Sequence, residues 1–345
     1  MTKSNLGHHF EDFSVGKVLR HATPLTVTTG DISLYRALTG SRHALFSAAP
    51  FAIANGFDGL PIDPLLAFHI VFGKSVPDIS LNAVANLGYA DGRFPVPVYP
   101  GDTLVAVSEV VGVKENSNRK TGVVYVRTCG FNQRQEEVLS YVRWVMVNKR
   151  SEASSAPALE VPDLPQSVDP TGLNYDRSYA AWEDDQAGAR QRFADYQVGE
   201  RIDHIDGMTV EEAEHQIATR LYQNTAKVHF DANAQAQSRF RKRLIYGGVV
   251  ISIARALSFN GLANAAEIIA INAGTHTAPL FAGDTVYAWS EVLDKAELNS
   301  TVGALRLRLV AVKNQAASKF LLRSEAGKYA DAVCLDFDYW AAIPK

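Results

Sequence analysis

Cysteine is scarce in this sequence. Only Cys129 and Cys334 occur among the 345 residues, and they lie far apart. Two isolated cysteines exclude a disulfide framework and the closely spaced cysteine pairs of zinc fingers. We therefore expect the chain to work in a reducing compartment, the cytoplasm.

Excess charge and long apolar runs are also missing. The chain has 34 basic and 37 acidic residues, a formal net charge of -3, whereas bulk nucleic-acid binding needs a marked basic excess. No stretch is apolar enough to span a bilayer, and the segment from Met1 to Phe13 is polar, without the apolar core of a secretory leader. We expect neither a nucleic acid nor a membrane as partner, although a local basic cluster could still bind an anionic small molecule.

The usual signatures of nucleotide, nicotinamide and zinc chemistry are absent as well. The sequence has no phosphate-binding loop, no Rossmann glycine fingerprint, no HExxH and no C-x-x-C pair. Nucleotide hydrolysis, hydride transfer and zinc proteolysis therefore lose their usual indicators. We expect no metal site.

What the sequence does contain is an internal repeat. The segment Phe10–Gly16 reads like Phe193–Gly199, an offset of 183 positions (193 − 10). Further on, Pro97–Thr103 resembles Pro279–Thr285, with an offset of 182 (279 − 97). One offset maintained over such a length predicts two tandem copies of one structural unit, which agrees with a length of about two ordinary domains.

The two copies are separated by a proline-rich segment from Lys149 to about Gly188. Its composition is that of a linker without a core of its own, although Tyr175, Tyr179 and Trp182 indicate that its later part packs against something. We therefore expect an N-terminal domain at residues 1–150, a linker at 151–188 and a C-terminal domain at 189–345.

Each copy shows the same order of elements. A short helix precedes a longer apolar helix, and alternating, β-rich runs follow. The helices are expected at Asp31–Leu38, Pro64–Phe72, Glu211–Tyr222 and Gly247–Leu257, and the strands at Thr103–Val113, Gly122–Asn132, Val138–Val147, Thr285–Leu293, Val302–Val312 and Ala330–Tyr339. A buried helix followed by an antiparallel meander predicts an α+β fold with the sheet wrapped around the helix. Two such units side by side would form a tandem, or double, hot-dog fold.

The residues best suited to catalysis lie in the loop Gln223–Asp231. His229 is flanked there by the amide of Asn224 and the carboxylate of Asp231. A general base, a group that orients it and a partner for an oxyanion are what proton abstraction next to a thioester requires.

This loop is similar to the signature of MaoC-like (R)-specific hydratases, in which an acidic residue lies five positions before a catalytic histidine. His229 matches the histidine, whereas Asn224 occupies the acidic position. Asparagine cannot act as a base, so the resemblance implies that His229 is the principal proton carrier and that Asn224 positions water or substrate. Asp231 is a candidate helper, although the signature does not place the second catalytic group there.

Longer strings resemble the mesaconyl-CoA hydratase subgroup. They are Leu221–Phe230, Arg243–Gly248 and Ala254–Gly261 in the second copy, and Phe68–Lys74 and Val76–Asn82 in the first. The resemblance covers nearly the whole chain apart from the linker. It implies a hydro-lyase that reversibly hydrates mesaconyl-CoA to β-methylmalyl-CoA, a step of the ethylmalonyl-CoA route. No separate cofactor is implied, because coenzyme A is part of the substrate, and a homo-oligomer is expected.

The first copy serves as an internal control. At the repeat offset, Phe46 corresponds to His229 and Ser41 to Asn224. A phenylalanine cannot transfer a proton, so we expect the first copy to be catalytically silent and to wall the acyl pocket. One active site per chain follows.

The start of the long helix in the second copy is a candidate oxyanion site. Gly247 and Gly248 would offer free backbone N–H groups to a negative oxygen, whereas proline at the equivalent Pro64 has no N–H to donate. Close packing of the helix on the sheet also explains these glycines. Tyr246 either orients water or substrate or serves packing.

Two further sets of residues complete the candidates. Arg239, Arg241, Lys242 and Arg243 form a basic cluster suited to the phosphates of coenzyme A, although such a run is also typical of a solvated loop. His276 lies near the end of an expected strand that passes close to the acyl chain in hot-dog folds, so it is a candidate ligand contact.

Three alternatives remain open on the sequence alone. They are an (R)-specific enoyl-CoA hydratase for fatty acyl chains, a non-catalytic acyl-CoA-binding protein and a thioesterase. A substrate with a second carboxylate would also need an arginine inside the pocket, and the sequence does not single one out.

Overall fold

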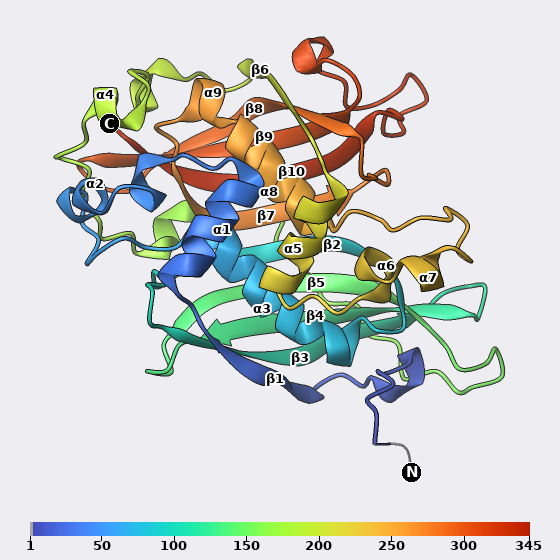
Figure 1. Ribbon diagram of the computed structural model, residues 1–345. Helices are drawn as coiled ribbons and strands as arrows, with labels where there is room; N and C mark the ends of the chain where they lie inside the picture. The colour runs from blue at the N-terminus through green and yellow to red at the C-terminus, as the bar shows by residue number, and fades with distance from the viewer. Residues whose placement is uncertain (1–2) are drawn as a thin grey trace.

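A single antiparallel sheet of ten strands forms the base of the molecule. The computed structural model describes residues 3–345; Met1 and Thr2, which open the polar segment noted above, lie outside the described residues. The sheet has the order β1-β3-β4-β5-β2-β7-β10-β9-β8-β6 (Figure 1). Its strands are β1 (Val18–Thr26), β2 (Ala83–Arg93), β3 (Thr103–Glu115), β4 (Thr121–Phe131), β5 (Glu137–Asn148), β6 (Arg201–Thr209), β7 (Glu267–His276), β8 (Thr285–Glu297), β9 (Val302–Lys313) and β10 (Val333–Pro344).

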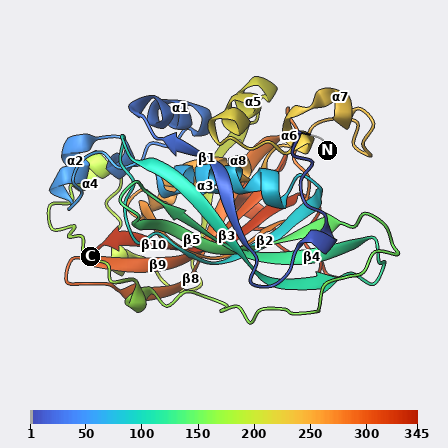
Figure 2. The same cartoon turned by 90° about the horizontal axis from the view of Figure 1, so that it is seen from below.

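The helices lie on one face of this sheet in two layers (Figures 1 and 2). The inner layer consists of α3 (Pro64–Ile79) and α8 (Gly247–Leu257), which pack against the strands of the first and second copy. Outside them lie α1 (Thr29–Thr39) and α5 (Glu212–Leu221). The shorter helices are α2 (Ala49–Ala54), α4 (Asp184–Ala187), α6 (Lys227–Phe230), α7 (Ala232–Gln235) and α9 (Phe259–Leu262), and the 3-10 turns are Phe10–Asp12, Ala44–Phe46, Pro170–Leu173, Phe193–Asp195 and Ala317–Lys319. The predicted α+β double hot-dog fold is confirmed.

The two copies meet at β2 and β7, which pair antiparallel at the centre of the sheet. Ala90 is the register partner of Ala273 in this pair, and the two residues are 183 positions apart (273 − 90). A residue that pairs with its own repeat mate must lie on the twofold axis that relates the copies. The offset read from the sequence therefore also locates the axis of the molecule.

Local sequence explains where the inner helices begin. The Asp63 carboxylate accepts a hydrogen bond from the Leu65 N–H at 2.9 Å, and Pro64 occupies the first helical position, where a missing N–H costs nothing. The predicted helix Gly247–Leu257 has the same bounds in the structure. Helix α3, by contrast, extends beyond the predicted Phe72 to Ile79.

Gly73, the first residue beyond the predicted helix end, lies inside α3 and close to the second copy. A Cβ atom at Gly73 would overlap the carbonyl oxygen of Tyr222, so glycine at this position allows the second copy to approach α3 closely. A similar limit of local pattern appears at the C-terminus, where β10 begins at Val333 and runs to Pro344 rather than spanning the predicted Ala330–Tyr339.

The later part of the linker segment packs onto the second copy. Tyr179 and Trp182 are buried, and the Trp182 indole N–H donates to the Asn264 side-chain oxygen at 3.0 Å. Among residues 3–345, no helix is both long and apolar enough to cross a membrane.

Candidate functional site

His229 lies on the one-turn helix α6, in the loop that follows α5. Its Nδ1 is 3.0 Å from the carbonyl oxygen of Leu244. A carbonyl can only accept, so Nδ1 carries the proton and Nε2 keeps a lone pair. Burial lowers the pKa of His229 to about 4, so the imidazole is neutral near pH 7 and is able to accept a proton.

Tyr246 and His215 lie next to the imidazole of His229 and are hydrogen-bonded to each other. The Tyr246 ring centre is 5.4 Å from that of His229, and Tyr246 is the N-cap residue of α8. Its backbone N–H donates to Nε2 of His215 at 2.9 Å. Burial lowers the pKa of His215 to about 3, so His215 stays neutral and holds the start of α8 beside His229.

The first turn of α8 lies between two imidazoles. A Cβ atom at Gly247 would overlap the ring of His276, and one at Gly248 would lie 2.6 Å from Nδ1 of His69. Both positions therefore require glycine for close approach, which supports the packing interpretation of these residues. The oxyanion interpretation also stands, because no acceptor among residues 3–345 takes a hydrogen bond from either glycine N–H.

Residues of the first copy reach this same turn. The Tyr89 hydroxyl of β2 lies 3.3 Å from Nε2 of His276. Burial and the nearby His229 lower the pKa of His276 to about 4. His69 of α3 is fully buried, and its Nε2 is 2.8 Å from the Ser252 hydroxyl. The site thus lies at the boundary of the two copies.

Asn224 and Asp231 have structural contacts of their own. The Asn224 side-chain oxygen accepts from the Ala226 N–H at 3.1 Å, and Asn224 is buried. Asp231 caps α7, since its carboxylate accepts from the Ala234 N–H at 2.9 Å. The structure gives Asp231 no contact with the ring of His229 among the described residues.

The basic cluster divides into surface and anchored members. Arg239 and Lys242 are exposed and lie over the rings of Phe240 and Phe281, at 4.2 Å in each case. Arg241 is exposed with a positive φ of 55°. Arg243 instead forms an ion pair with Glu212 and donates to the Phe230 carbonyl at 3.0 Å. Three of the four cations are therefore free to meet an anion from solvent.

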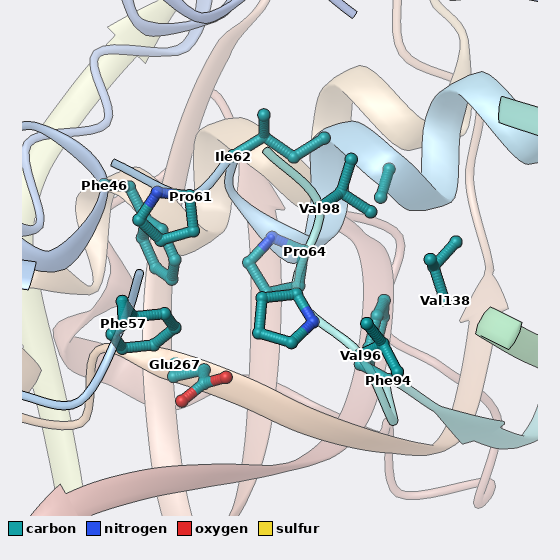
Figure 3. Close-up of a pocket in the computed structure, with 12 residues that line it drawn as sticks. Phe46, Phe57, Pro61, Ile62, Pro64, Phe94, Val96, Val98, Val138 and Glu267 are labelled. Atoms are coloured by element: carbon teal, nitrogen blue, oxygen red, sulfur yellow. The ribbon is translucent and has the colours of Figure 1, made fainter. Parts of the chain in front are cut away.

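The equivalent place in the first copy is an apolar pocket (Figure 3). Phe46 and Pro64, the counterparts of His229 and Gly247, both line this narrow space. Its acidic lining residue, Glu267, is held by Arg177 of the linker at 2.6 Å. No group of three or more metal ligands occurs within residues 3–345.

Sequence reasoning missed Tyr89 and His215, and it did not connect His69 with the site. A comparison of the copies carries a usable signal for the first two. At the repeat offset His215 corresponds to the apolar Ile32, and the aromatic Tyr89 corresponds to the amide Asn272. Such asymmetry is expected where only one of two copies is active.

Comparisons with a family model and with curated proteins indicate the same family. The family model of mesaconyl-CoA hydratase matches residues 2–321. The mesaconyl-CoA hydratase of Cereibacter sphaeroides is 59% identical over 99% of this chain and 100% of that protein. The β-methylmalyl-CoA dehydratase of Chloroflexus aurantiacus is 56% identical over 99% of both chains.

Solved structures agree with the fold. A MaoC domain protein from Chloroflexus aurantiacus superimposes with a TM-score of 0.98 at 55% identity, covering 100% of this chain and 99% of that one. A double hot-dog protein from Mycobacterium tuberculosis gives a TM-score of 0.76 at 24% identity, covering 98% and 99% of the two chains. The second likeness concerns the fold alone.

Proposed function

This chain belongs to the mesaconyl-CoA hydratase family, and from that premise we propose that it catalyses the reversible hydration of mesaconyl-CoA to β-methylmalyl-CoA. The observation that carries the proposal is full-length identity of 59% to a mesaconyl-CoA hydratase, together with a neutral imidazole at His229 whose Nδ1 is already bound. The enzyme is accordingly a hydro-lyase that acts on a coenzyme A thioester.

His229 is the proposed proton carrier. Its Nε2 takes a proton from water as the water oxygen bonds to the β-carbon of the enoyl thioester. The same nitrogen then returns a proton to the α-carbon, and dehydration follows these steps in reverse. Because the Asn224 oxygen is occupied by Ala226, we propose that Asn224 positions the water through its Nδ2 group, which can donate but cannot accept. Asp231 takes no proton in this scheme.

The first turn of α8 is the proposed oxyanion site. Negative charge develops on the thioester oxygen when the water oxygen adds to the β-carbon in hydration, and when the α-carbon loses its proton in dehydration. The free N–H groups of Gly247 and Gly248 lie at the positive end of an 11-residue helix, where they stabilise an anion. His276 and Tyr246 would border the acyl group.

The remaining proposals concern the environment of the reaction. We propose that Arg239, Arg241 and Lys242 bind the phosphates of coenzyme A and that no separate cofactor takes part. The enzyme is further proposed to work in the cytoplasm as a homo-oligomer.

Absorbance of the conjugated thioester tests the function directly. Purified protein added to mesaconyl-CoA is expected to remove this absorbance, with crotonyl-CoA reacting more slowly. Reaction with crotonyl-CoA alone would favour the fatty acyl hydratase. Release of free thiol would indicate a thioesterase, and reaction with neither would favour an acyl-CoA-binding protein.

A further inference from the structure

A buried arginine of the silent copy has no anionic partner. Arg143 on β5 is completely buried. Its terminal nitrogens donate to the hydroxyls of Ser75 at 2.9 Å and Ser80 at 3.0 Å, and its guanidinium lies 4.3 Å from the centre of the Phe72 ring. Within residues 3–345, no carboxylate forms an ion pair with it, and its Nε has no hydrogen-bond partner.

Two other arginines with little solvent exposure, Arg177 and Arg255, are compensated. Arg177 forms an ion pair with Glu267. Arg255 of α8 donates to the carbonyl oxygens of Ala265 and Ala266 and to the Ser258 hydroxyl. Arg143 therefore differs from them in having only neutral hydroxyl partners and one nitrogen without any.

Such an arrangement is costly unless an anion binds. Burial lowers the pKa of Arg143, yet a guanidinium remains charged in proteins. A buried charge without a counter-ion is destabilising, because burial removes the water that would otherwise solvate it. Hydrogen bonds to hydroxyls offset part of that cost, and a ligand carboxylate would supply the missing negative charge.

The position of Arg143 connects it with the catalytic site. Arg143 is the register partner of Tyr89 on β2, and the Tyr89 hydroxyl reaches His276 at 3.3 Å. On the other side, the Phe72 ring beneath Arg143 lies 5.6 Å from the ring of Tyr246. The buried Tyr246 hydroxyl also has no hydrogen-bond partner among the described residues.

We infer that Arg143 binds the carboxylate of a dicarboxylic enoyl-CoA at the end of the acyl chain that is remote from the thioester. The inference rests on the proposed function, in which the thioester carbonyl lies at the start of α8. The acyl chain then points from Gly247 past His276 and Tyr246 toward the first copy. A planar guanidinium with a free Nε suits a carboxylate in this place, and the Tyr246 hydroxyl would donate a second hydrogen bond. The silent copy thus supplies the substrate specificity.

Paired substrates test this inference. For Arg143→Met, kcat/KM with mesaconyl-CoA is expected to fall about a hundredfold or more, as for loss of one partner from a buried charge pair. The value for crotonyl-CoA, which lacks the carboxylate, is expected to change by less than about threefold. Arg143→Lys should retain part of the preference, because the charge remains. A matched control is Arg255→Met, which removes a buried arginine with full partners and should leave the substrate ratio unchanged.

Binding of unreactive thioesters separates this inference from the proposed function. The wild type is expected to bind succinyl-CoA at least about tenfold more tightly than butyryl-CoA, and Arg143→Met should abolish the difference. This readout needs no turnover, so it still tests Arg143 if the protein hydrates neither enoyl substrate. Equal binding of both thioesters by wild type, or an unchanged substrate ratio in a folded Arg143 variant, would overturn the inference. If Arg143→Met does not fold, the wild-type binding ratio and the Lys variant decide.

Discussion

His69 of α3 and Ser252 of α8 are hydrogen-bonded to each other at 2.8 Å, and they are separated by 183 residues. This separation is the repeat offset, so each residue contacts its own counterpart in the other copy. The bond therefore lies on the pseudo-twofold axis, as the Ala90–Ala273 pair does in the sheet. The first turn of α8, which holds the proposed oxyanion site, lies next to this axis, where side chains of both copies meet.

Ser252→Ala is expected to destabilise the protein. The Ser252 hydroxyl also accepts from the Tyr35 hydroxyl at 3.0 Å, so the substitution leaves two buried polar groups without a partner. The free energy of unfolding should fall by about 2 kcal/mol, as measured by urea denaturation. Ser33→Ala, at an exposed serine of α1 whose hydroxyl donates to the Thr29 carbonyl, should change it far less. Equal effects of the two substitutions would contradict the assignment.

His229→Ala is expected to lower kcat for hydration of mesaconyl-CoA by about 10²- to 10⁴-fold, the usual range for loss of a general acid–base group. Binding of butyryl-CoA should persist, because His229 does not anchor the coenzyme A moiety. Calorimetry with the unreactive thioester measures the binding. A variant that keeps more than about a tenth of wild-type kcat would exclude His229 as the proton carrier.

The pH dependence of activity should follow the neutral form of His229. Burial lowers its pKa from 6.5 to about 4, so the base remains unprotonated across the neutral range. We expect kcat/KM to stay level as pH falls through 6.5 and to decline only toward pH 4. An acidic limb centred near 6.5 would show that the catalytic base is not an imidazole with a lowered pKa.

The stability of the fold should decrease as the pH falls, because the folded protein holds several histidines at lowered pKa values. Burial lowers the pKa values of His69 and His215 to about 3 and those of His229 and His276 to about 4. Below pH 6.5 the unfolded chain takes up protons that the folded histidines do not, so protonation favours unfolding. The Tm is therefore expected to drop as pH decreases from 6.5 to 4. Replacement of His276 by Gln should make the Tm less dependent on pH. If scanning calorimetry shows the same change of Tm with pH in this variant as in the wild type, His276 does not contribute to the loss of stability in acid.

Gly248→Ala is expected to be harmful although alanine favours helices. The new methyl group would lie 2.6 Å from Nδ1 of His69 and would overlap the ring of Tyr246, so the first turn of α8 must shift. Overpacking of this kind costs about 1–3 kcal/mol, and kcat should fall with it. Gly30→Ala in the first turn of α1 is the matched control, because its nearest neighbour, Thr28 Oγ1, lies at 3.4 Å. Similar losses of stability at the two sites would contradict the close approach.

Loss of the exposed cations should weaken recognition of coenzyme A in a salt-dependent way. Arg239→Ala combined with Lys242→Ala is expected to raise KM for mesaconyl-CoA by about two- to fivefold at low salt, with a smaller effect at high salt. The pantetheine thioester, which lacks the nucleotide phosphates, should show no change. Arg190→Ala, at an exposed arginine near α4, is the control. An equal effect on both thioesters would mean that these cations do not bind phosphate.

Much of this protein is determined by its sequence. The 183-residue offset predicts two copies of one unit, and the order of helices and strands in each copy predicts the double hot-dog fold. His229 and the Gly247–Gly248 turn are also visible, because each depends on neighbours within a short stretch of chain. The assignment of Phe46 as the silent counterpart follows from the same offset.

Only the tertiary structure decided which other residues join the site. His69, Tyr89 and Arg143 come from an inner helix and two strands of the other copy, and their contacts span many residues in sequence. Alternation along β2 and β5 determines which side chains face α3, and the register of β2 against β7 brings Tyr89 to His276. No local sequence pattern specifies the register of two strands or the partner of a buried charge, because both depend on how distant segments pack together.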